Sequence, residues 1–279
     1  MVLFVILVIA VGWAVDQVEG GGTAALPIAG TFAFGSALVG YFAGDKMALA
    51  ANRATPIQKA DAPELYRLVE NLSITAGVPM PKVYIIPSPA INAFATGRDP
   101  QHASIAVTQG ALETLERSEL EGVLAHELSH VKNYDIRLMM IVAVFVGTIV
   151  LIGDWFFRSR LWGLHGGRSR ERQAGTAVFA LIGLVLLILS PLIAQLIQFA
   201  VSRRREFLAD ASAVLLTRYP DGLANALKKI HAHHQPVETA NRATAHLYIA
   251  NPLSGKTLGT LFSTHPPIEE RINALQQMA

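Results

Sequence analysis

Cysteine is absent from this 279-residue chain, and charged residues are few. The absence of cysteine excludes disulfide bonds and thiolate chemistry, so any metal site has to use nitrogen and oxygen ligands. Charged residues make up 16% of the chain, whereas soluble domains carry about 25%. The apolar fraction is 52%, and the mean hydropathy is +0.38. This composition excludes a disordered chain and favours a membrane protein. The net charge of only +2 argues against nucleic acid as a partner.

The deficit of charge is concentrated in four apolar stretches. They are Val2–Val15, Thr23–Ala43, Leu138–Gly153 and Ala174–Ser202. The second and the fourth have the roughly 20 residues that a membrane helix needs. The first and the third are shorter, and each could instead be a buried core helix. We expect about four transmembrane helices beside one domain of catalytic size.

The basic residues indicate an orientation for these helices. The link Asp16–Gly22 contains two acidic residues and no basic one, whereas Lys46, Arg53 and Lys59 follow the second stretch. Because basic residues are enriched on the cytoplasmic side, the N-terminus and the Asp45–Arg137 region are expected in the cytoplasm.

The polar parts of the chain predict an α+β domain. Helices are expected at Asp61–Ala76 with Asp61 as its cap, at Leu112–Tyr134, at Asp221–His234 and at Pro266–Gln277, and strands at Val83–Ile86, Asn92–Thr96 and Ser104–Thr108.

The segment Ala125–His130 reads A-H-E-L-S-H and contains the pattern H-E-x-x-H. On a helix, His126 and His130 share one face because they are four residues apart, so two imidazoles can bind one zinc ion. Glu127 lies on the adjacent face, where its carboxylate can reach the water that the zinc ion activates.

A catalytic zinc ion needs a third protein ligand. The metzincin pattern is excluded, since Asn133 and Ile136 occupy the positions of its glycine and histidine. A downstream carboxylate remains. Glu206 and Asp210 are four residues apart and therefore share one face of a helix. One of them can bind zinc while the other orients a histidine or a nearby arginine by a hydrogen bond from outside the ligand set. The alternative is an acidic pair that neutralises Arg203–Arg205 beyond a membrane helix.

These residues resemble the HtpX-like membrane zinc metalloproteases, which are related to the type I CAAX prenyl proteases. The resemblance covers nearly the whole chain and rests on N-A-F-A-T-G at Asn92–Gly97, A-H-E-L-S-H-V at Ala125–Val131, E-F-L-A-D at Glu206–Asp210 and S-T-H-P-P at Ser263–Pro267. It implies a mostly helical zincin-like (gluzincin) domain with a small β-sheet, combined with the transmembrane helices. About four apolar stretches are too few for the enclosed chamber of the CAAX proteases, which favours the HtpX branch.

The resemblance also implies roles for individual residues. One zinc ion per subunit is expected on His126, His130 and Glu206, with Glu127 as the general base. His265 and Arg271 are expected to support the transition state, although either could instead have only a local structural role. The strand formed by Asn92, Ala93, Phe94 and Ala95 is expected to hold an extended substrate along its edge.

The domain organisation follows from these assignments. Residues 1–44 and 138–202 are expected to form two membrane hairpins, and residues 45–137 and 203–279 the two halves of the catalytic domain. Since one zinc ion needs both halves in one compartment, the chain between them must cross the membrane twice or not at all. The arginine-rich link Arg158–Arg172 conflicts with a simple hairpin, and a re-entrant or bent pair would remove the conflict.

The resemblance therefore implies a multi-pass zinc endopeptidase of the bacterial inner membrane, with its catalytic domain facing the cytoplasm. Its partners are expected to be the lipid bilayer and polypeptide substrates, namely misfolded or damaged membrane proteins. Two alternatives remain open at this point. One is a proteolytically silent membrane scaffold that binds client proteins, and the other is a processing protease of narrow specificity.

Overall fold

The computed structural model describes residues 25–143, 203–233, 235–240, 244–253 and 266–278, together with positions 5, 9 and 13. The chain divides into two compact units. The first comprises Met1–Phe42 and Val144–Leu196, and the second comprises Ala43–Ala143 and Ile197–Ala279. Helix α2 (Ala25–Ala51) begins in the first unit and ends in the second.

Helix α2 contains most of Thr23–Ala43, one of the four stretches expected to cross a membrane. Within the residues that the structure describes, no helix is both long and apolar enough to make such a crossing. Apart from positions 5, 9 and 13 and residues 138–143, the other three stretches lie outside the described residues.

The second unit contains one mixed sheet in the strand order β1-β2-β4-β3. Its strands are β1 (Thr55–Pro56), β2 (Lys82–Ile86), β3 (Ala93–Gly97) and β4 (Ala103–Thr108). Strands β2 and β4 are parallel, with Val83 opposite Ile105, and β3 runs antiparallel to β4, with Ala95 opposite Ile105. The three strands expected from the sequence are confirmed to within one residue at each end, and β3 is an edge strand.

Both faces of the sheet are buried. Ala95 and Ile105 belong to the larger hydrophobic core, which α3, α5, α8, α9 and α11 also line. Phe94 and Ala106 point to the opposite face, where they pack with Leu49 and Tyr248. This alternation along the strands follows from the two-residue period of β structure.

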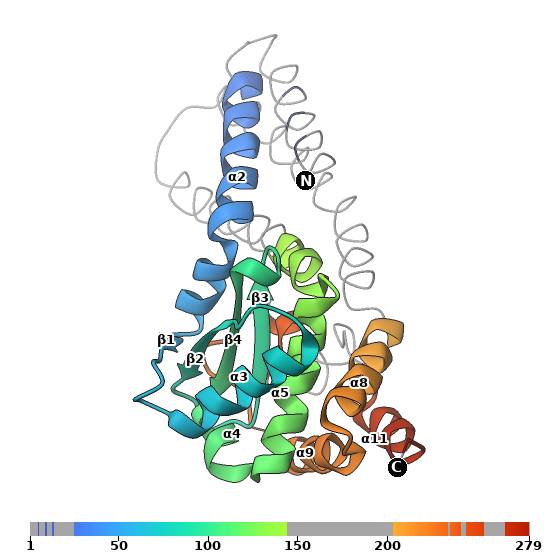
Figure 1. The fold of residues 1–279 in the computed structure, drawn as a ribbon. Coiled ribbons are helices and arrows are strands. Elements are labelled where there is room, and N and C mark those ends of the chain that lie inside the picture. Colours follow the sequence, from blue (N-terminus) through green and yellow to red (C-terminus); the bar gives the residue numbers. More distant parts are fainter. Residues whose placement is uncertain are drawn as a thin grey trace, which may run out of the picture. The chain divides into compact units, whose positions relative to one another are not determined.

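The helices of this unit surround the larger core. They are α3 (Pro63–Ala76), α4 (Gln109–Thr114), α5 (Arg117–Lys132), α8 (Arg203–Thr217), α9 (Pro220–Ala232) and α11 (Ile268–Gln276), with 3₁₀ turns η1 (Pro100–His102) and η2 (Ala245–Leu247). Helix α5 lies between the sheet on one side and α8 and α9 on the other (Figure 1).

Two details of the predicted helices were wrong. The single helix at 112–134 is broken into α4 and α5, because Glu116 and Glu119 form a capping box that starts a new helix. The N-cap of α3 is Ala62 rather than Asp61. The Asp61 carboxylate instead accepts a hydrogen bond from the Gln58 N–H. The mostly helical architecture with a small sheet is confirmed.

Helices α5 and α9 approach closely at a pair of glycines. A Cβ atom added at Gly122 would lie 2.7 Å from the Leu223 backbone nitrogen, and one added at Gly222 would lie 2.5 Å from the Ser118 carbonyl oxygen. Backbone atoms cannot yield as side chains do, so both positions require glycine. This contact fixes α5, the helix that contains the H-E-x-x-H motif.

Gly122→Ala is therefore expected to lower the melting temperature of the protein. Overpacking costs about 1–3 kcal/mol, which outweighs the gain of up to about 1 kcal/mol from replacing a helical glycine by alanine. Thermal unfolding of chelator-treated protein measures the effect without a contribution from metal. Glu121→Ala on the same turn is the control and should change stability by no more than about 0.5 kcal/mol. An unchanged or raised melting temperature for Gly122→Ala would contradict the tight crossing.

Candidate metal centre

Three side chains from two helices converge in the interior of the second unit. His126 and His130 lie on one face of α5, and Glu206 lies in the first turn of α8, which packs against α5. One ligand atom from each of the three lies within 4.8 Å of the others. Their exposed fractions are 0%, 4% and 0%. This group could hold a metal ion.

The distances within the group are short. The Nε2 atoms of His126 and His130 are 3.2 Å apart. The Glu206 carboxylate lies 3.8 Å from the first of these nitrogens and 3.6 Å from the second. Two nitrogens bound tetrahedrally to zinc at about 2.05 Å would be about 3.3 Å apart, so the spacing of the imidazoles fits a shared metal ion.

A carboxylate lies behind each histidine. Asp210 Oδ1 is 2.9 Å from His126 Nδ1, and Asp135 Oδ2 is 3.0 Å from His130 Nδ1. Since a carboxylate only accepts hydrogen bonds, each Nδ1 is the protonated nitrogen of its ring. Nε2 is then the nitrogen of each ring that is left to bind a metal, and the two Nε2 atoms face each other and Glu206.

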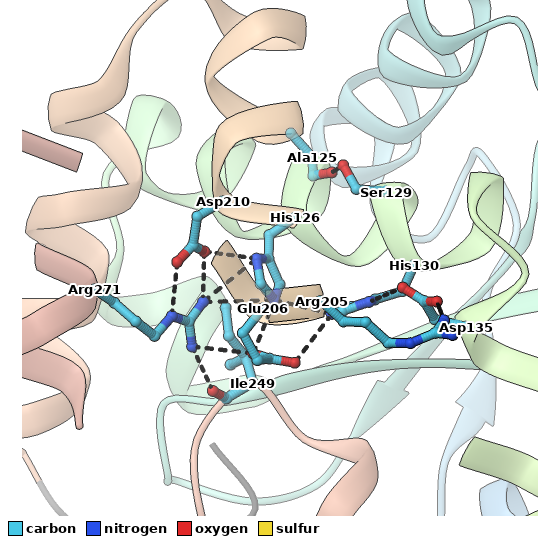
Figure 2. Close-up of polar contacts among 10 residues, drawn as sticks. All are labelled: Ala125, His126, Ser129, His130, Asp135, Arg205, Glu206, Asp210, Ile249 and Arg271. Atoms are coloured by element: carbon cyan, nitrogen blue, oxygen red, sulfur yellow. Dashed lines mark hydrogen bonds and ion pairs between the residues drawn. The ribbon is translucent and has the colours of Figure 1, made fainter. Parts of the chain in front are cut away.

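Each of these carboxylates is paired with an arginine. Arg271 donates from Nε to Asp210 Oδ2 at 2.9 Å and from Nη2 to Asp210 Oδ1 at 2.7 Å. Arg205 donates from Nη1 to Asp135 Oδ1. Figure 2 shows the two histidine–aspartate–arginine sets on either side of Glu206.

Arg271 is fully buried and donates hydrogen bonds to more than one acceptor. Besides Asp210, it donates from Nη1 to the Ile249 carbonyl oxygen at 3.1 Å, and the same Nη1 lies 3.5 Å from Glu206. The alternative to a functional role for Arg271, a pairing with Glu269 or Glu270 on the surface, is therefore wrong. The side chain enters the site from α11 and holds two of its carboxylates.

Glu127 is buried beside the two imidazoles. Its exposed fraction is 1%, and among the described residues its Oε1 atom has no hydrogen-bond partner. Burial, reinforced by the nearby Glu206 carboxylate, raises the pKa of Glu127 to about 8. The group therefore holds a proton in the metal-free site at neutral pH. The positive charge of a bound metal ion would favour release of that proton, so that the carboxylate could accept a proton and return it.

The two histidines titrate in opposite directions. Burial and the positive charge of Arg271 lower the pKa of His126 to about 4. Burial also disfavours protonation of His130, but its hydrogen bond to Asp135 and the charge of Glu206 outweigh burial and raise its pKa to about 9. In the metal-free site at neutral pH, His130 is therefore the histidine that carries a positive charge, and His126 is neutral.

The substrate strand needs a correction. Ile249 N–H donates to the Ala93 carbonyl oxygen at 3.0 Å, and Phe94 is bridged to Tyr248. The Asn92 side chain donates to the Ala250 carbonyl oxygen at 3.0 Å. Residues 248–250 therefore already occupy the outer edge of β3 at Ala93 and Phe94. Among the described residues, no other segment forms a backbone hydrogen bond with this edge from Ala95 onward.

The remaining predicted residue, His265, lies outside the described residues. Two residues of the site were missed from the sequence, namely Asp135 and Arg205. Asp135 follows the end of α5, after a turn in which Tyr134 adopts a positive φ of 61°. The only available signal was an isolated acidic residue five positions after the second histidine.

Comparison with known proteins agrees with this geometry. The model of "Peptidase family M48" matches residues 59–279. A "Protease HtpX homolog" of Dictyoglomus turgidum is 52% identical over 220 residues, which are 79% of this chain and 71% of that protein. One of Caldanaerobacter subterraneus subsp. tengcongensis is 44% identical over 279 residues, which are 100% of this chain and 93% of that protein.

A solved structure shares the fold. The crystal structure of S. mikatae Ste24p matches with a TM-score of 0.54 and 20% identity, over 95% of this chain. The present chain spans 62% of the length of that protein. The family model covers most of the chain, and the two relatives exceed 40% identity. The chain therefore belongs to peptidase family M48 and, within it, to the HtpX-like metalloproteases, as its motifs indicated.

Proposed function

We propose that this protein is a zinc-dependent endopeptidase that cleaves misfolded or damaged membrane proteins. The observation that carries the proposal is the convergence of two imidazoles and one carboxylate beside a buried glutamate, Glu127. Two histidines with one glutamate form a ligand set typical of catalytic zinc. In a chain without cysteine, these borderline and hard donors favour zinc over softer metals.

The charge of the site also fits one divalent cation per subunit. Its four buried carboxylates, each at most 2% exposed, belong to Glu127, Asp135, Glu206 and Asp210. Arg205 and Arg271 supply only two positive charges to this group. In the metal-free site the protons on Glu127 and His130, whose pKa values are raised to about 8 and about 9, neutralise the remaining two negative charges. A divalent cation that displaces these two protons leaves the buried charge balanced.

A zinc ion bound by His126, His130 and Glu206 would act as a Lewis acid toward water and the peptide carbonyl. Glu127 would accept a proton from the attacking water as the new C–O bond forms. The same carboxyl group would then give that proton to the amine nitrogen as the C–N bond breaks. Arg271 would hold Asp210 and Glu206 in place during these steps, and we retain His265 as a donor to the developing oxyanion.

The substrate is proposed to lie in extended form along β3, from Ala95 onward. Main-chain pairing with an edge strand accepts many sequences, which suits an enzyme that removes damaged proteins. Ala95 is well placed for this role, because its backbone N–H lies next to the Glu127 carboxylate. The scissile bond would therefore be presented close to the general base.

We further propose that the protein resides in the bacterial inner membrane with its metal centre on the cytoplasmic side. The proposal rests on the four apolar stretches and on the basic residues that follow the second of them. The full-length protein is expected in the membrane fraction after carbonate extraction of cells that express it. Recovery in the carbonate supernatant, where a soluble marker protein also appears, would overturn the membrane assignment.

Glu127→Gln is expected to retain zinc and to lose proteolysis. Glutamine preserves the size of the side chain but cannot accept a proton, so the cleavage rate should fall by about 10²–10⁴-fold. Zinc content and cleavage of an unfolded protein substrate are measured on the same preparation. Glu121→Gln, one to two turns earlier on α5, should behave like the parent. If Glu127→Gln cleaves as fast as the parent, this proton-transfer mechanism is wrong.

Zinc affinity is expected to rise with pH up to about pH 9. Below that value His130 carries a proton in the metal-free site, and zinc binding has to displace it, so affinity should change by about tenfold or more per pH unit. Below about pH 8 Glu127 also holds a proton, and its release on zinc binding would steepen the change. His126, whose pKa is about 4, contributes nothing above pH 6. Competition with a chelator of known pH dependence, between pH 6 and 9.5, gives the profile. A constant affinity between pH 6 and 8 would contradict the raised pKa of His130.

A further inference from the structure

The side of the site that faces away from Arg271 contains a second set of charged groups. Asp135 Oδ2 lies 3.0 Å from His130 Nδ1, and Arg205 contacts the other oxygen of the same carboxylate. The arrangement mirrors that of Asp210 and Arg271 behind His126. In Figure 2 the two sets approach their imidazoles from opposite directions.

The backbone after α5 is shaped to deliver Asp135 to this position. In a continuous α-helix, residues five apart are about 140° apart around the axis, so a side chain at 135 would point away from His130. The helix instead ends at Lys132, and Tyr134 has a φ of 61°. Bulky residues rarely adopt this left-handed conformation. The Arg137 guanidinium lies 5.0 Å from the centre of the Tyr134 ring, and this cation–π contact stabilises the turn.

Burial makes the partnership of Asp135 and Arg205 necessary. The Asp135 side chain is 2% exposed, and a buried carboxylate needs compensating charge. Arg205, whose side chain is 40% exposed, provides this charge from the residue directly before Glu206. One turn of α8 thus supplies both a ligand carboxylate and the cation that holds the carboxylate behind another ligand.

We propose that Asp135 and Arg205 form a positioning pair for His130. Asp135 keeps the proton on Nδ1 and fixes the rotation of the ring, so that the Nε2 lone pair points toward His126 and Glu206. Arg205 holds Asp135 in the orientation that this requires. This inference rests on the proposed zinc site, because the pair acts by preparing His130 to bind the metal.

The test measures zinc affinity in the detergent-solubilised full-length chain by competition with a chelator. Asp135→Asn is expected to weaken zinc binding by about 10–100-fold, because the amide is neutral and can present a donor to His130. Arg205→Ala should weaken it by a smaller factor, and Arg205→Lys should recover part of that loss. Arg204→Ala is the matched control, because it removes the same charge from an exposed neighbouring position and should bind zinc like the parent.

The double variant Asp135→Asn/Arg205→Ala tests whether the two residues act together. If Arg205 acts through Asp135, the double variant should bind zinc no more weakly than Asp135→Asn alone. The visible absorption of the cobalt(II)-substituted protein should change in Asp135→Asn and remain unchanged in Arg204→Ala. A role confined to folding would instead lower the melting temperature of the metal-free protein and leave this spectrum unaltered.

The outcomes separate this inference from the proposed function. If the parent and Asp135→Asn bind zinc with equal affinity, the positioning role is wrong and the metal site stands. Losses that add in the double variant would overturn the coupling of Arg205 to Asp135. If Asp135→Asn does not fold, Arg205→Ala must show the weaker binding by itself, and parental affinity in that variant overturns the proposal. A parent protein that binds no zinc overturns the proposed function and this inference together.

Discussion

The concentration of buried ionisable groups between α5 and α8 is the constraint on which the rest of this structure depends. Four carboxylates lie in the interior around two imidazoles. Two arginines compensate half of their charge, and in the metal-free site the protons held by Glu127 and His130 compensate the rest. Burying charge without a partner costs more free energy than a domain can spare. One divalent cation could replace these two protons, and the three side chains that would bind it, His126, His130 and Glu206, already lie close together.

The fold brings together groups that are far apart in the chain to meet this requirement. The histidines come from α5, Glu206 and Asp210 from α8, and Arg271 from α11. Close packing at Gly122 fixes α5 against α9, and the capping box at Glu116 fixes where α5 begins. Rigid elements are suited to this task, because a metal site tolerates only small displacements of its ligands.

Local patterns made much of the site predictable. Ligands four residues apart on one helix leave a signature in the sequence, so His126, His130 and the pair Glu206 and Asp210 were recognisable. Strand positions were also predictable, since alternation of buried residues is a local property. Other features depend on contacts between distant segments. The left-handed turn at Tyr134 and the segment that covers β3 at Ala93 and Phe94 follow from tertiary packing and have no periodic signal.

The sequence by itself determined which metal-binding groups are available to this protein and which family it belongs to. It fixed the donor types through the absence of cysteine, the motif through helical spacing, and the family through the combination of short motifs. Only the tertiary structure decided which carboxylate stands behind which histidine, because that choice depends on how α8 and the turn after α5 meet. It also showed that Arg271 is buried against Asp210 rather than paired on the surface. The spacing of residues along one helix can be read directly from the sequence, because the helical period is fixed. Contacts between helices depend on how the whole core packs, and the sequence has no local pattern for them.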